Sequence, residues 1–222
     1  MSTIIIGNGP SILAEKMGFF IDTFDNIVRL KRCHNSLKNP DYYGTRTTHV
    51  GGSLTIAGEL REVHAGEYWI FFDSRHAHIS PDILTARMAS DMNLGRLFNG
   101  SSVICDQEIC NQWDEIYRGA RDPMEWAEQM ADSKSNDPIL GENHTSQGFK
   151  AILYACKYLK DKQIDLIGFD NLFTGEFTWS TTRGPEWDKY PKHNWATERK
   201  LLEKVKDTFN KDIRFIYSNE VL

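Results

Sequence analysis

Ile4-Ile5-Ile6-Gly7-Asn8-Gly9-Pro10-Ser11 stands near the amino end of the chain. Three β-branched residues in a row are typical of a buried strand, and the two glycines permit a tight turn after it. Apolar residues then recur at helical spacing from Ile12 to Met17, with Ser11 as the expected N-cap. The segment therefore predicts a strand, a turn and a helix, which is the opening unit of a doubly wound α/β sheet.

The rest of the chain repeats this alternation. Five further apolar segments are expected to be strands: residues 25–30, 49–50, 68–73, 164–170 and 213–217. Helices are expected over residues 80–98, 111–131, 147–159 and 195–209, with loops over 133–144 and 171–192, the latter an active-site loop or lid. This order predicts one α/β domain over residues 1–222, with a Rossmann-like, doubly wound, mostly parallel sheet. Its motifs should lie at the carboxyl ends of strands, where such sheets bind ligands.

Composition narrows the class of protein. The 222 residues are 40% hydrophobic and 26% charged, which suits a sizeable core. A net charge of −5 excludes binding of nucleic acid through the overall charge of the protein. Local basic segments remain at residues 31–38 and 199–206. No stretch approaches the roughly 18 apolar residues of a membrane helix, and the four cysteines lack the CxxC spacing of zinc sites. Because the Gly7–Ser11 turn follows so soon after Met1, we expect no signal peptide. We expect a cytoplasmic protein without a membrane span.

The glycine turn is the first candidate site. Glycines beside a helix start let a phosphate approach the free backbone amides. Ile12 stands where a dinucleotide fingerprint has its third glycine, so that motif is broken. An ordinary strand-to-helix turn is an equally good interpretation of this segment alone.

Three later segments also have the composition of sites. Residues 44–49 (Gly-Thr-Arg-Thr-Thr-His) suit a polar ligand or a solvated strand edge, and residues 144–148 (His-Thr-Ser-Gln-Gly) suit a helix cap or an anion site. His193 and Glu198 are spaced as His–x4–Glu at the start of a helix, whose dipole disfavours protonated histidine. A neutral imidazole there can accept a proton from an attacking hydroxyl, although a surface cap is the commoner role of such a histidine.

Some motifs are absent from the sequence. It contains no Asp-x-Asp, the carboxylate pair usual for a metal–diphosphate site, and no Gly-x-Ser-x-Gly elbow, Walker loop or HExxH. We therefore expect neither a metal nor another cofactor.

In their order and spacing, the four segments resemble the sialyl motifs of the eukaryotic-type sialyltransferases. Residues 4–30 resemble the long motif, residues 44–49 the segment after it, residues 145–169 the short motif, and residues 193–198 the very short motif. The Gly7–Ser11 turn is also similar to that of bacterial sialyltransferases and nonulosonate transferases. The matching segments span residues 3–198, most of the chain.

The resemblance implies a single-domain, GT-A-like fold and a metal-independent, inverting transfer of sugar from a nucleotide-sugar donor. It implies that His193 is the general base and that Glu198 orders that helix or the nucleotide side. The donor-binding residues would be Gly7, Asn8, Gly9, Pro10, Ser11, Lys31, Thr47, Thr145, Ser146, Gly148 and Glu198. Residues that could contact the acceptor or support the site are Arg46, His49, Trp187 and Tyr190.

The sequence departs from the family at several places. The family's aromatic-rich third motif has no clean counterpart, and residues 187–190 are only a loose stand-in for it. Lys31 replaces a nucleotide-contacting asparagine, and a cation there could meet the second phosphate of a UDP donor. Thr3 and Leu159 stand where the family's cystine would fall, so that bond cannot form.

Several functions stay open at this point. The donor could carry CMP or UDP, and the acceptor could be a saccharide or hydroxymethylated DNA, in a bacterial or virus-encoded enzyme. A non-catalytic nucleotide-binding module and a nucleotide-sugar hydrolase are alternatives from other classes. A pure binder would need no base at His193, and a hydrolase would release product without an acceptor.

Overall fold

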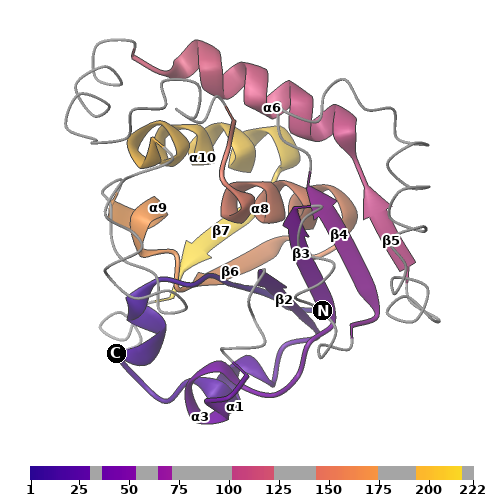
Figure 1. The fold of residues 1–222 in the computed structure, drawn as a ribbon, viewed down its shortest axis with the longest axis vertical. Helices are drawn as coiled ribbons and strands as arrows, with labels where there is room; N and C mark the ends of the chain where they lie inside the picture. Colours follow the sequence, from indigo (N-terminus) through magenta and orange to yellow (C-terminus); the bar gives the residue numbers. More distant parts are fainter. Residues whose placement is uncertain (31–36, 54–64, 72–101, 123–143, 175–193, 217–222) are drawn as a thin grey trace.

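The protein's computed structural model describes residues 1–30, 37–53, 65–71, 102–122, 144–174 and 194–216 (Figure 1). Their strands form one seven-stranded sheet in the order β5-β4-β3-β2-β1-β6-β7, and every neighbouring pair is parallel. The strands are β1 (Thr3–Ile6), β2 (Asn26–Leu30), β3 (His49–Ser53), β4 (Glu67–Phe71), β5 (Ser102–Cys105), β6 (Gln163–Ile167) and β7 (Asp212–Phe215). The predicted Rossmann-like α/β class is confirmed.

The strand order reverses beside β1. From β1 the chain adds β2 to β5 outward on one side, then returns to place β6 and β7 on the other. In register, Ile6 lies between Arg29 of β2 and Ile167 of β6. The residues that follow β1 and β6 therefore leave the sheet side by side at a topological switch point, where open α/β sheets form their ligand crevice.

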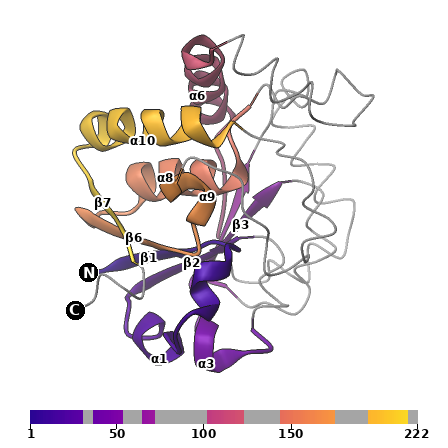
Figure 2. The ribbon, with the colours of Figure 1, turned by 90° about the vertical axis from the view of Figure 1, so that its left-hand side faces the viewer.

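Helices cover both faces of the sheet (Figure 2). The short helices α1 and α3 lie on one face, and α8 lies on the other with α10 and α6 beyond it (Figure 2). The helical elements are η1 (Pro10–Leu13, a 3₁₀ turn), α1 (Gly18–Ile21), α3 (Pro40–Tyr43), α6 (Gln107–Ala120), α8 (Gln147–Tyr158), α9 (Asp170–Thr174) and α10 (Trp195–Phe209).

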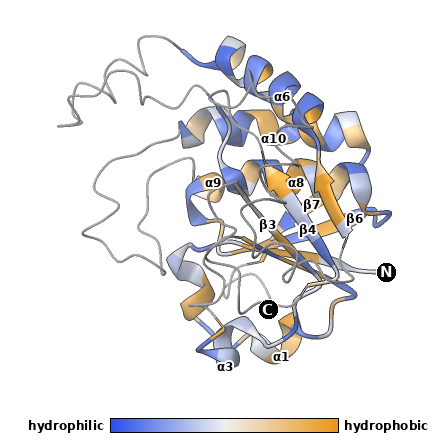
Figure 3. Cartoon of the chain, turned by 45° about the vertical axis from the view of Figure 1, so that its right-hand side comes forward, coloured by the Kyte–Doolittle hydropathy of each residue, from blue (hydrophilic) through white to orange (hydrophobic). Residues whose placement is uncertain are grey.

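Side-chain alternation along the strands builds a separate core on each face. Ile5 packs into the cluster formed with α6, α8 and α10, whereas Ile4 and Ile6 pack toward α1 and α3. This is the period-two pattern of a strand buried on both sides. Hydrophobic and hydrophilic residues alternate along α6 and α10 (Figure 3), as expected of helices with one covered face.

The structure differs from the predicted elements at several places: the helix expected from Ile12 to Met17 is reduced to the 3₁₀ turn η1, and α6 ends at Ala120 rather than 131. Strand β5 was not expected, and α6 begins at Gln107 rather than 111 because the Asp106 carboxylate caps it, accepting from the Ile109 amide at 2.9 Å. Helix α9 occupies Asp170–Thr174, where a loop was predicted. Ser11 is not the N-cap, because η1 begins at Pro10 with Gly9 in the capping position. The helix predicted over 80–98 lies outside the described residues.

Candidate functional site

The Gly7–Ser11 turn packs tightly against the turn that follows β6. The Gly7 amide donates to Ile167 O and the Gly9 amide to Gly168 O, both at 2.8 Å. A Cβ on Gly7 would lie 2.2 Å from Gly168 O, and one on Gly9 would lie 1.9 Å from Asp170 Oδ2. Gly168 itself has φ +71°, a left-handed conformation that favours glycine. These glycines thus allow the turn after β1 to pack directly against the turn after β6, independently of any ligand.

Asp170 holds the other end of the same turn. Its carboxylate accepts from the Ser11 amide at 3.0 Å and from Ser11 Oγ at 2.8 Å. Asn8, Gly9 and Ser11 remain partly exposed beside it. Asp170 is not among the predicted site residues, although Gly168-Phe169-Asp170 ends a predicted strand and so places an acidic residue at its carboxyl end.

The start of α8 is joined to α10 through one buried glutamate. Ser146 caps α8, its Oγ accepting from the Phe149 amide at 3.1 Å. The same hydroxyl donates to Glu198 Oε2 at 2.8 Å, and the Ser146 amide donates to Glu198 Oε1. Ser146 and Glu198 belong to two different predicted motifs, 52 residues apart in sequence, and the structure brings them into direct contact.

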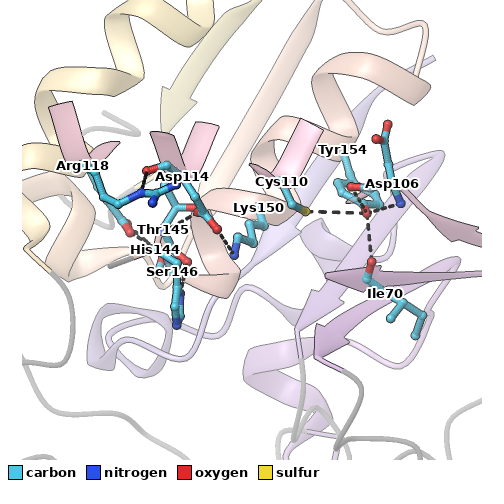
Figure 4. Close-up of polar contacts among 11 residues, drawn as sticks. Ile70, Asp106, Cys110, Asp114, Arg118, His144, Thr145, Ser146, Lys150 and Tyr154 are labelled. Atoms are coloured by element: carbon cyan, nitrogen blue, oxygen red, sulfur yellow. Dashed lines mark hydrogen bonds and ion pairs between the residues drawn. The ribbon is translucent and has the colours of Figure 1, made fainter. Parts of the chain in front are cut away.

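Asp114 of α6 fixes the residue before that cap (Figure 4). Its Oδ1 accepts from the Thr145 amide at 2.8 Å and from Thr145 Oγ1 at 2.7 Å, and its Oδ2 lies 3.2 Å from Lys150 Nζ. All three residues are buried, so the carboxylate and the ammonium compensate each other's desolvation. Removing one partner of such a pair typically costs about 3–5 kcal/mol, which indicates a rigid start for α8.

Gly148 connects α8 to the turn after β6. A Cβ at this position would lie 2.9 Å from Phe169 Cε1, so the first turn of α8 rests against the Phe169 ring. Phe169 lies between Gly168 and Asp170, which contact the Gly7–Ser11 turn. Glycine turn, β6 turn and the starts of α8 and α10 therefore form one continuous set of contacts at the carboxyl edge of the sheet.

Helix α10 begins at a fully buried N-cap. Asn194 Oδ1 accepts from the Thr197 amide at 2.8 Å, and the Asn194 amide donates to the Tyr117 hydroxyl of α6 at 2.9 Å. His193, the residue immediately before this cap in sequence, lies outside the described residues, as do Lys31, Trp187 and Tyr190.

The remaining predicted segment lies elsewhere. His49 is the first residue of β3 and pairs with Glu67, the first residue of β4, so it lies at the amino ends of these strands and not at a carboxyl end as expected. The cause is Thr48, whose Oγ1 accepts from the Ile27 amide at 2.6 Å and donates to Ile27 O at 3.0 Å, fixing where β3 begins. His49 Nδ1 lies 2.7 Å from Thr48 Oγ1, and its Nε2 lies 3.7 Å from Glu67 Oε1.

The neighbouring polar residues have internal partners as well. Arg29, which is buried, donates from Nε to Thr47 Oγ1 at 2.9 Å, and Arg46 donates from Nη1 to Phe24 O at 3.0 Å. Burial lowers the pKa of His49, and Glu67 offsets only part of that effect. In this segment the polar side chains connect β3 to β2 and β4.

Other chemistries find little support among the described residues. No three His, Cys, Asp or Glu side chains gather there as metal ligands. Burial raises the pKa of Cys105 to about 11 and that of Cys156 to about 12, so both stay protonated thiols and poor nucleophiles. None of the described helices has the length and apolar character to cross a membrane.

Comparison with known proteins bears on the fold. No protein-family model and no curated protein sequence matches the chain. Among solved structures, a mammalian sialyltransferase in complex with Gal-beta-1-3GalNAc-ortho-nitrophenol is similar over 97% of this chain and 69% of its own, with a TM-score of 0.56 and 16% identity. The chain has a sialyltransferase-like fold. The resemblance predicted from the sequence is confirmed at this level.

Within this sialyltransferase-like fold, the predicted site residues fall into three groups. Gly7, Asn8, Gly9, Pro10, Ser11, Thr145, Ser146, Gly148 and Glu198 lie together at the carboxyl edge. Arg46, Thr47 and His49 lie at or before the amino end of β3. The third group, Lys31, Trp187, Tyr190 and His193, lies outside the described part of the chain.

Proposed function

We propose that this protein is an inverting glycosyltransferase that moves a sugar from a nucleotide-sugar donor to a hydroxyl of a saccharide acceptor. The observation that carries the proposal is the pair of hydrogen bonds from Ser146 to Glu198, which joins two sialyl-motif-like segments in a sialyltransferase-like fold. The Gly7–Ser11 turn lies at the switch point on the same edge of the sheet, where such a fold binds its ligand.

The proposed reaction is a direct displacement with His193 as general base. The acceptor oxygen attacks the anomeric carbon and forms the new C–O bond, and the proton of the acceptor hydroxyl passes to the His193 imidazole. The bond from the anomeric carbon to the phosphate oxygen of the donor breaks, and its electron pair leaves with the nucleotide. His193 directly precedes the N-cap of the 15-residue α10, whose positive dipole end favours the neutral imidazole that a base needs. The donor is a CMP or UDP sugar, sialic acid-like in the family's case, with Lys31 available to a second phosphate.

A saccharide acceptor is proposed over DNA, in the first place because Arg199, a basic side chain of α10, is engaged by neighbouring aromatic rings. Lys206 pairs with Glu203 at 2.8 Å, and the Arg199 guanidinium lies 5.3 Å from the Phe173 ring and 5.2 Å from the Phe215 ring. The Arg199 contacts are a cation–π arrangement, whereas the Lys206–Glu203 pair is an ion pair on the helix surface. The mammalian structure that shares this fold was solved with a disaccharide derivative, which also favours a saccharide.

Donor binding and base catalysis can be tested in one series. A thermal-shift screen of CMP and UDP sugars identifies the donor, which at 100 times its Kd should stabilise the protein by about 2.7 kcal/mol. We expect His193→Ala to lower kcat about 10²- to 10⁴-fold, the usual value of general-base help, with donor Kd and melting temperature nearly unchanged.

His49→Gln is the matched histidine control, because His49 lies at the amino end of β3, away from the glycine turn. It should keep its kcat. Full activity in His193→Ala would contradict the assignment of the base, and absence of any stabilising nucleotide sugar would contradict the proposed activity itself.

The reaction is also proposed to need no metal, since the sequence lacks Asp-x-Asp. Initial rates measured with the identified donor should be the same in excess EDTA as in added Mg²⁺ or Mn²⁺. Loss of turnover on chelation with recovery in Mn²⁺ would show that a metal takes part.

A further inference from the structure

Helix α6 presents two buried polar side chains to its neighbours. Asp114 and Tyr117 are three residues apart, so they lie on the same face of the helix. Tyr117 is 0% exposed and Asp114 is 1% exposed. Neither residue belongs to a sialyl-motif-like segment, and the proposed reaction has given neither a role.

Each of the two contacts the start of a different helix. Asp114 accepts both hydrogen bonds from Thr145, directly before the cap of α8. The Tyr117 hydroxyl accepts from the amide of Asn194, the cap of α10, at 2.9 Å. One face of α6 thus holds two helix starts that both lie at the carboxyl edge of the sheet.

The third contact closes the arrangement. Ser146 and Glu198 join α8 directly to α10, so α6, α8 and α10 are connected pairwise through buried polar groups. Buried hydrogen bonds are directional and costly to leave unmade, so such an arrangement fixes relative position more firmly than apolar packing alone. A shift of α6 would therefore move the two helix starts together.

We propose that Tyr117 is a positioning residue for the reaction, fixing the start of α10 and through it the adjacent His193. The proposal rests on the proposed function in so far as His193 is the base. Asn194 is fully buried and its amide is one bond removed from His193, so the Tyr117 hydroxyl acts on the backbone that carries the base. Displacements of about 1 Å in such a group can cost on the order of 10²-fold in rate.

The isosteric variant Tyr117→Phe removes the hydroxyl and keeps the ring in the core. We expect kcat to fall about tenfold, the equivalent of one buried hydrogen bond, with the donor Kd from calorimetry unchanged. In a His193→Ala background the same substitution should cost nothing further, because Tyr117 acts through His193. A merely structural role would lower the rate by the same factor in both backgrounds, and that result would overturn the proposal.

Tyr154→Phe is the matched control. Tyr154 is equally buried, and its hydroxyl donates to Ile70 O at 2.9 Å and accepts from the Asp106 amide at 2.7 Å, away from both helix starts (Figure 4). This variant should keep the wild-type kcat. An equal loss of rate in Tyr154→Phe and Tyr117→Phe would also overturn the proposal, because removing any buried hydroxyl would then lower kcat to the same extent.

Amide hydrogen exchange tests the anchor without any assay of transfer. Tyr117→Phe should speed exchange of the Asn194 amide about tenfold, while exchange at the carboxyl end of α10 stays as in the wild type. An unchanged Asn194 rate overturns the proposal whatever the kinetics show. If the wild type transfers no sugar or His193→Ala is fully active, the proposed function fails, and the exchange result still decides whether Tyr117 holds α10.

Discussion

Single residues at the switch point constrain one another closely. A Cβ on Gly9 would lie 1.9 Å from the Asp170 carboxylate and 2.8 Å from Gly168 O. The carboxylate could turn away only by giving up its bonds to Ser11, and a backbone carbonyl of a buried turn has little room to move. Glycine at position 9 is therefore required by the β6 turn, whatever ligand the site binds.

We expect Gly9→Ala and Asp170→Ala each to lower the free energy of unfolding by about 1–3 kcal/mol, through overpacking in the first case and lost hydrogen bonds in the second. The double variant should lose less than the sum, because removing the carboxylate removes the shortest clash. Urea denaturation measures all three values.

Gly119→Ala is the control, because a Cβ at this helical position in α6 meets nothing within 4 Å. Alanine should stabilise the helix there by about 0.5–1 kcal/mol. Strict additivity of the Gly9 and Asp170 costs would show instead that the Gly168 backbone alone excludes a side chain at position 9.

Among the elements, β3 shows how a strand's start determines the environment of a side chain. His49 begins the strand, where its ring lies 5.0 Å from that of Trp69 and its Nε2 faces Glu67. Burial lowers the pKa of His49 and Glu67 offsets only part of this effect, so the folded protein binds a proton on the imidazole less readily than a solvated histidine does. The unfolded chain has no such restriction.

A pH dependence of stability follows from this difference. The unfolded state takes up a proton on His49 as the pH falls through about 6.5, while the folded state does so only at lower pH. The folded state is therefore destabilised as the pH falls below about 6.5 and unaffected above it. The melting temperature of His49→Gln should fall less between pH 7 and 5.5 than that of the wild type, and identical falls would contradict the shifted pKa.

The elements that could be predicted are those with a strong local pattern. Strands β1 and β2 and helices α8 and α10 agree with their predicted ranges to within about two residues, because their buried faces repeat at the strand or helix period. Strand β5 was missed because it is four residues long and half of it is exposed. Helix α9 was missed because five residues are too few to show a helical period.

For the whole molecule, the sequence identified the segments of the site but not what holds them together. The motifs are local in sequence: the glycine turn, the helix caps and the His–x4–Glu spacing each lie within a few residues. The contacts between them are not, since Ser11 bonds to Asp170 across 159 residues and Ser146 to Glu198 across 52. Asp114 and Tyr117 carry no motif, so only the packing of α6 reveals their contacts. The same limit applies to His49. It was expected at a carboxyl end, but it lies at the amino end of β3 because the strand begins at this residue.

The interior position of β1, between β2 and β6, has a consequence for synthesis of the chain. Ile4 pairs with Ile27 on one side, but its other partner, Asp165 of β6, follows much later in the sequence. At typical elongation rates the ribosome reaches β6 on the order of ten seconds after β1. During this interval the most apolar strand of the sheet has one unpaired edge, an arrangement that invites association between nascent chains. Completion of the fold is thus a late event that awaits the carboxyl-terminal third, and chaperones that shield strand edges should raise its yield.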